Sequence, residues 1–223
     1  MEHKHFYLKA FNLANNLNES QLMELSNNFS HKEARKGQVI YSKGYDNNVF
    51  LLVSGKVKIS EFNANGDEMI KEVLSPGDLF GGVMLSNTGL NFEYAEIISE
   101  RAIYFVIGTE PLTALMKSNY LITMNYMAKV NEKFKNLENR YVNMVSKDVK
   151  SRLIFCFKEW ARKEGKSQGD RVIIKNSLTH NDLANLISTS RQTVTVILNE
   201  LKEAGAIRYN RREIEFFPLM LAS

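Results

Sequence analysis

The sequence of 223 residues is poor in cysteine and lacks long apolar runs. Cys156 is the only cysteine, which excludes an internal disulfide and any zinc or iron–sulfur site that needs several cysteines. One cysteine fits a reducing compartment and is typical of a core residue rather than a redox switch. No apolar run approaches the roughly 20 residues of a membrane span, and the N-terminus lacks the pattern of a signal peptide. We therefore expect a cytoplasmic protein with no membrane partner.

Catalytic and metal-binding patterns are also missing. The sequence has no evident Ser/His/Asp or Cys/His constellation and no phosphate-binding Gly-x-x-x-x-Gly-Lys loop, so we do not expect an enzyme. Its four histidines are scattered, and we expect no metal site and no cofactor, although a haem held by a single histidine stays open. These histidines are His3, His5, His31 and His180.

Positive charge is concentrated in the last third of the chain. The formal net charge is +4, but residues 1–146 hold 15 Lys/Arg against 16 Asp/Glu, whereas residues 147–223 hold 14 against 9. Such asymmetry indicates a polyanionic partner for the C-terminal part. A solvated, lysine-rich face is the simpler alternative at this point.

Hydrophobic periodicity divides the chain into a first part of about 110 residues, which is the size of a domain, and two further segments. Residues 6–30 have helical spacing, whereas residues 36–107 hold short runs rich in β-branched and aromatic residues, separated by turn sequences such as Asn65-Gly66-Asp67. Many short strands with regular turns predict an antiparallel barrel or jelly roll. We take residues 1–110 as one domain.

A long helix is predicted over residues 111–146, beginning near Pro111. Its apolar residues recur at steps of three and four for about two and a half heptads, which is shorter than a firm coiled coil requires. Such a stripe either packs on its own domain or forms a homodimer, and we favour the homodimer because the helix links two domains. The interface residues are Met127, Val130, Phe134, Leu137, Tyr141 and Met144.

Residues 147–223 predict a winged helix-turn-helix. After a helix over 148–164, Thr179-x-x-Asp182 forms an N-cap signature, Ser190 supplies a second cap, and Gly205 ends the second helix. Residues 206–217 then predict a β-hairpin with arginines at its tip. A plain two-helix packing unit is the alternative, but the turn, the polar helix face, the basic hairpin and the local charge all favour DNA.

The polar residues of this motif suit the chemistry of DNA. Arginine matches the two acceptors of guanine in the major groove, and glutamine matches adenine. Capping hydroxyls, helix N-termini and the hairpin arginines suit phosphates. The predicted DNA-binding residues are Thr179, Ser190, Arg191, Gln192, Thr193, Thr195, Arg211 and Arg212.

Nearly the whole chain resembles the Crp/Fnr family of bacterial transcription regulators. The resemblance is carried by residues 50–59, residues 74–81, the helix at 111–146 and above all Ser190-Arg191-Gln192-Thr193-Val194. It implies an α+β fold with a cyclic-nucleotide-binding-like β-roll, a dimerisation helix and a winged helix-turn-helix. It also implies guanine reading by Arg191, a phosphate contact by Thr179 and RNA polymerase as a partner. Val196 stands where the catabolite activator protein of this family has a second base-reading arginine, so we expect a different half-site.

The sensor part departs from the cyclic-AMP-binding members of the family. Those members hold the ribose with a glutamate at the position where this chain has Gly82. They hold the cyclic phosphate with an arginine in the region where this chain has the sequence Asn-Phe-Glu-Tyr, residues 91–94. No lysine or arginine occurs between Lys71 and Arg101. Because a buried phosphate needs a cation or several aligned N–H donors, we expect neither cyclic AMP nor cyclic GMP as effector.

Two alternatives stay open: regulation by an effector of unknown identity, and activity without any effector. The residues that could line a pocket, or simply fill the core, are Phe80, Gly81, Gly82, Phe92, Glu93 and Tyr94. The leading hypothesis is a homodimeric, sequence-specific regulator that binds an inverted-repeat operator in double-stranded DNA. The alternative is a signalling adaptor that uses the cyclic-nucleotide-like domain for protein contacts and has no need of Arg191.

Overall fold

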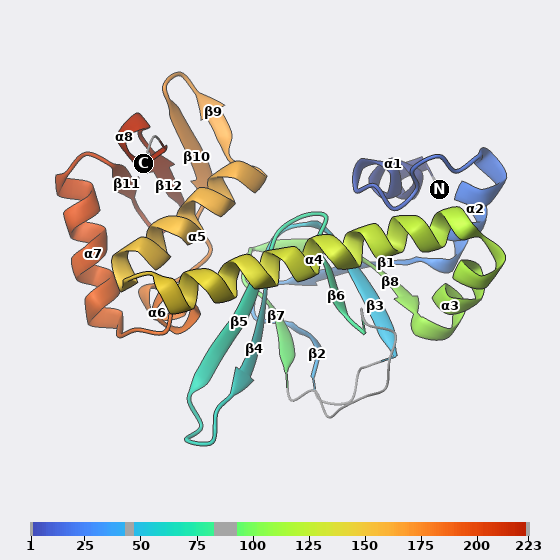
Figure 1. The fold of residues 1–223 in the computed structure, drawn as a ribbon, viewed down its shortest axis with the longest axis horizontal. Coiled ribbons are helices and arrows are strands. Elements are labelled where there is room, and N and C mark those ends of the chain that lie inside the picture. The colour runs from blue at the N-terminus through green and yellow to red at the C-terminus, as the bar shows by residue number, and fades with distance from the viewer. Residues whose placement is uncertain (1, 43–46, 83–92, 222–223) are drawn as a thin grey trace. The chain divides into compact units, whose positions relative to one another are not determined.

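The computed structural model describes residues 2–42, 47–82 and 93–221 (Figure 1). The chain divides into two compact units, one made of residues 1–61 and 73–138 and the other of residues 62–72 and 139–223. None of the described helices combines the length and the apolar character needed to cross a membrane.

The first unit is built from several helices and two four-stranded antiparallel sheets, of which most of β5 is counted with the second unit. The sheets have the strand orders β1-β8-β3-β6 and β2-β7-β4-β5. The helices are α1 (Glu2–Ala10), α2 (Glu19–Asn28), α3 (Thr109–Ser118) and α4 (Tyr120–Ser146), the last of which continues into the second unit. The strands are β1 (Ser30–Arg35), β2 (Val39–Tyr41), β3 (Asn48–Ser54), β4 (Val57–Phe62), β5 (Glu68–Leu74), β6 (Leu79–Gly81), β7 (Tyr94–Ile97) and β8 (Arg101–Gly108). This arrangement confirms the predicted antiparallel β-roll.

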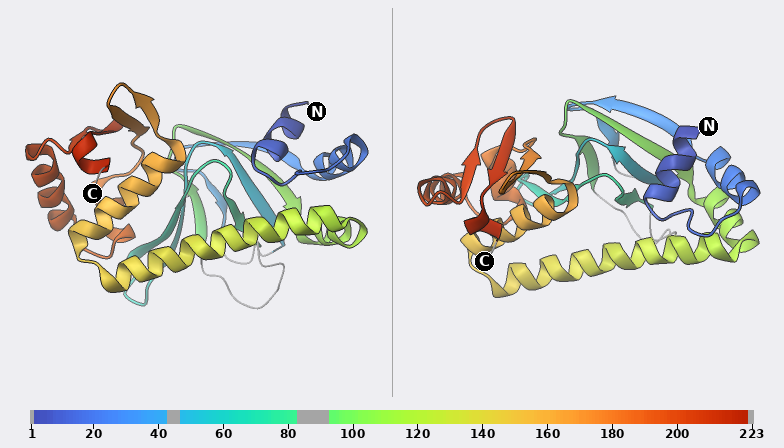
Figure 2. Two further views of the ribbon diagram at one scale, coloured as in Figure 1. Left: turned by 45° about the horizontal axis from the view of Figure 1, so that its top comes forward. Right: turned by 90° about the horizontal axis from the view of Figure 1, so that it is seen from above.

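Strand β3 separates two cores, and its alternation explains an unbroken hydrophobic run. Residues on one face of β3, such as Leu51, pack with α1, α2, α3 and the start of α4, which cover this side of the sheet (Figure 2). Residues on the other face, such as Phe50, point between the two sheets and fill the roll. Both faces of β3 are therefore buried, and its sequence shows no polar alternation.

The predicted helix over 111–146 is interrupted at Asn119, which corrects the sequence-based expectation. Asn119 adopts an extended conformation with φ −139° and ψ 107°. Its side-chain Oδ1 accepts hydrogen bonds from the N–H groups of Leu121 and Ile122, at 3.0 and 3.4 Å. This asparagine therefore caps a new helix, and the segment becomes α3 followed by α4.

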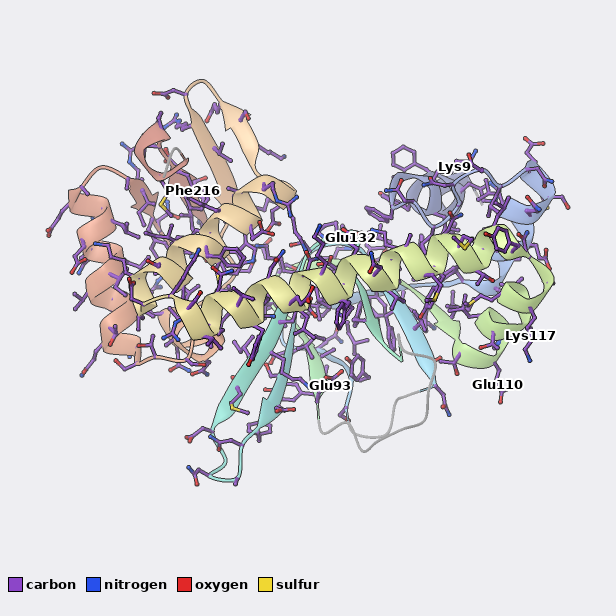
Figure 3. All side chains as sticks on the ribbon, viewed as in Figure 1. Lys9, Glu93, Glu110, Lys117, Glu132 and Phe216 are labelled. Atoms are coloured by element: carbon purple, nitrogen blue, oxygen red, sulfur yellow. The ribbon has the colours of Figure 1, made fainter. Side chains whose placement is uncertain are left out.

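The second unit holds the C-terminal elements around one core. A four-stranded sheet has the order β11-β12-β10-β9. Phe216 of β12 is fully buried, with its ring centre 5.6 Å from that of Phe157 on α5 (Figure 3). The elements are α5 (Val149–Glu164), β9 (Lys166–Gln168), β10 (Arg171–Lys175), α6 (His180–Leu186), α7 (Arg191–Glu203), β11 (Ile207–Tyr209), β12 (Glu213–Phe216) and α8 (Pro218–Leu221).

Candidate DNA-binding surface

Helix α6 begins at a complete capping box, as the sequence predicts. The Thr179 hydroxyl accepts a hydrogen bond from the Asp182 N–H at 3.1 Å, and the Asp182 carboxylate accepts one from the Thr179 N–H at 2.8 Å. The hydroxyl of Thr179 also donates to Asp182 at 2.7 Å. Its proton is therefore committed to the cap, and the phosphate contact that the family resemblance implies for Thr179 stays a prediction.

The turn between α6 and α7 depends on two serines. Ser188 lies between the two helices and adopts a left-handed conformation with φ +53°, which is uncommon for a residue other than glycine. Ser190 then caps α7, because its Oγ accepts a hydrogen bond from the Thr193 N–H at 3.0 Å. The Thr193 hydroxyl lies 2.9 Å from the same Oγ. Ser190 and Thr193 therefore fix the direction from which α7 leaves the turn.

Helix α7 is strongly two-sided, and its first turn presents the predicted base-reading residues. Arg191 and Gln192 are both exposed, and no hydrogen bond or ion pair is recorded for either side chain within the described part of the chain. The helix ends at Glu203, two residues before Gly205, whose φ of +68° favours glycine. The opposite face packs into the unit through the buried side chains Val194, Ile197, Leu198 and Leu201. The arrangement leaves one arginine and one glutamine free to meet base edges.

Thr195 is engaged within the motif, unlike Arg191 and Gln192. Its hydroxyl donates to the Arg191 carbonyl at 2.9 Å and lies 2.8 Å from Nδ1 of His180. The His180 ring in turn lies 5.5 Å from the Tyr209 ring of β11. Because the Thr195 proton is used, His180 Nδ1 acts as the donor. This histidine therefore joins α6, α7 and β11, a role that its place directly after the Thr179 cap could have suggested.

We expect acid to weaken the second unit through His180. Burial, helped by the charge of Arg191, lowers the pKa of the His180 ring from its usual value of 6.5. Unfolding restores that value, so the unfolded chain binds more protons just below pH 6.5. The free energy of unfolding should then fall as the pH drops below neutral, until the lowered pKa is passed.

Urea unfolding at a series of pH values tests this expectation. The fluorescence of Trp160, the single tryptophan, reports on the second unit. His180→Gln should flatten the pH dependence between neutral pH and pH 6, while His31→Gln in the first unit should leave it unchanged. An equal slope in the wild type and in His180→Gln would contradict the assignment.

The hairpin of β11 and β12 forms the predicted wing. Asn210 shapes its tip, because its Oδ1 accepts hydrogen bonds from the N–H groups of Arg212 and Glu213 at 2.7 and 3.0 Å. Arg211 and Arg212 are exposed, and no ion pair is recorded for either of them among the described residues. The wing tip therefore offers two cations to a phosphate backbone.

Two further arginines of this sheet share one carboxylate partner. Glu215, whose side chain is 8% exposed, accepts from Arg171 at 2.6 Å and lies 3.4 Å from Arg208. The Arg208 guanidinium also lies 5.8 Å from the centre of the Phe217 ring. One carboxylate thus partly compensates two guanidinium groups, and the three side chains together keep a net positive charge in addition to that of the wing tip.

Aromatic rings fill the inside of the β-roll. Tyr41 stacks on Phe50 with ring centres 5.3 Å apart, and Phe50 stacks on Phe80 at 5.0 Å. The Tyr41 hydroxyl donates to the carboxylate of Glu93 at 2.9 Å (Figure 3). All three rings are buried, which supports the interpretation of Phe80 as a core residue. Glu93, one of the tentative pocket residues, is held by this stack.

The other tentative pocket residues border the same region. Gly81 ends β6, and the Gly82 N–H donates to a backbone carbonyl of β3 at 2.8 Å. Tyr94 begins β7 and is half-buried. Phe92 lies outside the described residues. A pocket at these residues stays a prediction.

One lysine of the adjacent strand β4 is paired. Lys58 of β4 lies opposite Glu96 of β7, and its Nζ is 3.3 Å from the Glu96 carboxylate. Val57 and Ile59, its neighbours in sequence, belong to the core of the roll, so Lys58 lies on the other face of the strand. Lys58 is therefore not placed to hold an anion between the sheets.

The apolar stripe lies on α4, and most of it is exposed. Four of the six predicted residues expose between 52% and 68% of their surface: Met127, Phe134, Leu137 and Tyr141. Met144 is half-buried, and Val130 packs against the core of the first unit, so this part of the stripe serves its own domain. The exposed surface continues at residues that the heptad pattern missed, namely Tyr120, Met124, Val142 and Val145.

Cys156 has the properties of an unreactive thiol. Burial raises the pKa of this thiol to about 11, so the thiolate is scarce at neutral pH. Within the described ranges, His, Cys, Asp and Glu residues form no group of three that could hold a metal ion.

Comparison with known proteins gives the same two domains. The model of the Crp-like helix-turn-helix domain matches residues 151–217, and the model of the cyclic nucleotide-binding domain matches residues 31–119. The chain is 23% identical over 181 residues to the CRP-like cAMP-activated global transcriptional regulator of Mycobacterium tuberculosis, covering 80% of each. It is 29% identical over 175 residues to the HTH-type transcriptional regulator ArcR of Staphylococcus aureus, covering 75% of this chain and 71% of that one.

A solved structure shows the same fold. The structure of FixK2 from Bradyrhizobium japonicum matches with a TM-score of 0.72 and 18% identity, covering 85% of this chain and 92% of that chain. The order of the β-roll, the long helix, the helix-turn-helix and the wing is thus predicted by the sequence and found in the structure, and the two matched domains follow in the same order. The chain belongs to the Crp/Fnr family of DNA-binding transcription regulators.

Proposed function

We propose that this chain is a homodimeric, sequence-specific transcription regulator that acts in the cytoplasm. Each subunit places α7 in a major groove, where Arg191 reads guanine and Gln192 reads adenine. Arg211 and Arg212 hold the adjacent phosphates, with Ser190 and Thr193 setting the angle of the helix. The observation that carries the proposal is the free Arg191–Gln192 pair at the exposed start of a helix that is buried on its other side.

The second copy of the chain is the proposed occupant of the exposed α4 stripe. Four large hydrophobic side chains of this helix are exposed, and a monomer gains nothing from such a surface; they are Met127, Phe134, Leu137 and Tyr141. A second copy related by a two-fold axis would cover the stripe with the same stripe. The two α7 helices would then read an inverted repeat with half-sites one helical turn apart, or a multiple of it. RNA polymerase is the proposed partner of the DNA-bound dimer.

Selection from random duplexes tests this function. The full-length chain should enrich an inverted repeat with a guanine in each half-site and a centre-to-centre spacing of about 10 base pairs or a multiple of it. If no sequence is enriched, the proposal is contradicted and the signalling adaptor is favoured. The match to a helix-turn-helix domain gives that alternative no support.

The regulatory proposal is that cyclic AMP and cyclic GMP are not the effectors. The mycobacterial relative is named as cAMP-activated, but this chain has no cation between Lys71 and Arg101. The stack of Tyr41, Phe50 and Phe80 also occupies the space between the sheets. A different effector, or activity without ligand, fits these features better.

Calorimetry tests the regulatory proposal. Titration of the chain with cyclic AMP or cyclic GMP should give no saturable heat, because a buried phosphate would face acidic side chains without a compensating cation. Operator binding should be equal with and without either nucleotide. Specific binding of micromolar strength would overturn this part of the proposal.

A further inference from the structure

Val196 is a conspicuous apolar side chain on the polar face of α7. It exposes 56% of its surface, and in the described part of residues 147–220 it is the only large hydrophobic side chain exposed to such a degree. Gln192, Val196 and Asn199 are all exposed at positions i, i+4 and i+7, so they form one row along the helix. The row lies opposite the buried side chains that begin at Val194.

Neither packing nor helix formation accounts for valine at this position. Its side chain has no core to fill, and valine forms helices less readily than alanine or the long polar residues that commonly occupy exposed positions. A stiff, branched side chain does have one advantage for binding, because little rotamer freedom is lost when it is immobilised. The position therefore suits a small apolar group on a partner.

The major groove displays one such group, the C5-methyl of thymine. The two amides that flank Val196 have the chemistry that recognises adenine, the partner of thymine, through its N6 and N7. Gln192 lies one turn before Val196, and Asn199 lies one turn after it. A major groove that contacts this row therefore contacts an amide, then the methyl groups of valine, then a second amide. A base-pair step that contains A·T pairs offers adenine to the two amides and a thymine methyl group to Val196.

We propose that Val196 contacts the methyl group of a thymine in each half-site and thereby selects an A·T pair there. The inference rests on the proposed function, because it requires α7 to enter the major groove. It adds a specificity-determining residue at the position where the family resemblance implied only a lost arginine contact. A protein surface is the competing occupant of Val196, and the experiment below separates the two.

Uracil substitution tests the inference directly, because deoxyuridine differs from thymidine only by this methyl group. Each thymine of the selected operator is replaced singly, and the affinity of the wild type is measured. One thymine per half-site should be sensitive, with a loss of about fourfold for each missing methyl contact, as expected from the transfer free energy of one such group. The two sensitive positions should be related by the symmetry of the operator.

The variant Val196→Ala identifies the side chain that senses the methyl group. It should bind the thymine and uracil operators equally while keeping the guanine preference that Arg191 supplies. Val39→Ala, at a valine that is 52% exposed in the first unit, should keep the wild-type ratio of the two affinities. Because alanine favours helix more than valine, Val196→Ala should fold, and its circular dichroism checks this.

The outcomes separate this inference from the proposed function. Selection of no operator would refute the proposed function and this inference with it. A selected operator without any uracil-sensitive position would overturn the inference alone. So would a uracil sensitivity that Val196→Ala retains at the wild-type ratio, which is the result expected if Val196 faces a protein instead of the thymine methyl group.

Discussion

Replacing Arg191 by alanine is expected to remove most of the preference of this protein for its operator. Arg191 lies exposed in the first turn of α7, with no ion-pair partner recorded in the described part of the chain. A guanidinium that binds both acceptors of guanine contributes roughly 1–3 kcal/mol of discrimination. Affinity should therefore fall about 5- to 150-fold for each half-site, while binding to unrelated duplexes changes little.

Two further variants separate recognition from charge. Arg191→Lys keeps the positive charge but loses the planar fork, so it should lose nearly as much specificity as Arg191→Ala. Arg162→Ala removes an equal charge from α5, where Arg162 pairs with Glu159, and it should leave the operator preference intact. Anisotropy titrations on operator and scrambled duplexes measure these effects. If Arg191→Ala kept the wild-type ratio of affinities, the role given to Arg191 would be wrong.

The double variant Phe134→Asp with Leu137→Asp is expected to produce monomers. Both side chains are exposed on α4 in the single chain, at 60% and 61%, so the substitutions do not disturb its own core. In a dimer the two aspartates of each subunit would be buried without a cation, which is strongly unfavourable. Sedimentation velocity should show the monomer over the concentrations at which the wild type is a dimer.

Loss of the dimer should also weaken operator binding. Two linked α7 helices bind the second half-site at a high effective concentration, and separate subunits lose this advantage. Asn131→Asp with Asn139→Asp adds the same charge to other exposed positions of α4 and should leave the dimer intact. A dimer that persists in Phe134→Asp with Leu137→Asp would place the interface elsewhere.

The helix-turn-helix was predictable because its signals are local. Thr179 and Asp182 are three residues apart, as are Ser190 and Thr193, and the structure confirms both caps. The cap formed by Asn119 is equally local, but helical periodicity continues on both sides of it and hid the break. Local signals therefore predicted the existence of the helices more reliably than the residues at which they begin and end.

Strands with few buried residues were harder to predict. In β1 only Ala34 is buried, because this strand lies at a sheet edge, and its sequence is mostly charged. The three-residue strands β6 and β9 are too short to show a period. These strands form because they hydrogen-bond to a neighbouring strand. A short stretch of sequence does not reveal that neighbour.

Pairings between distant residues could not be predicted. Tyr41 and Glu93 are 52 residues apart, and the Arg171–Glu215 pair spans 44 residues. The sequence indicated wing arginines but not that Glu215 pairs with two others. It also left Thr195 among the base readers, whereas the fold brings its hydroxyl to His180. The net charge of the C-terminal third therefore does not show which of its arginines are already paired within the sheet.

The ratio of affinities for the selected operator and for a scrambled duplex tests the central claim most directly. Measured at physiological salt with the wild-type chain, it should be at least about a thousandfold, as is typical of specific regulators. Most of this ratio should depend on Arg191 and on the dimer. A ratio near one would mean that the chain binds DNA only through its positive charge, and it would contradict the account.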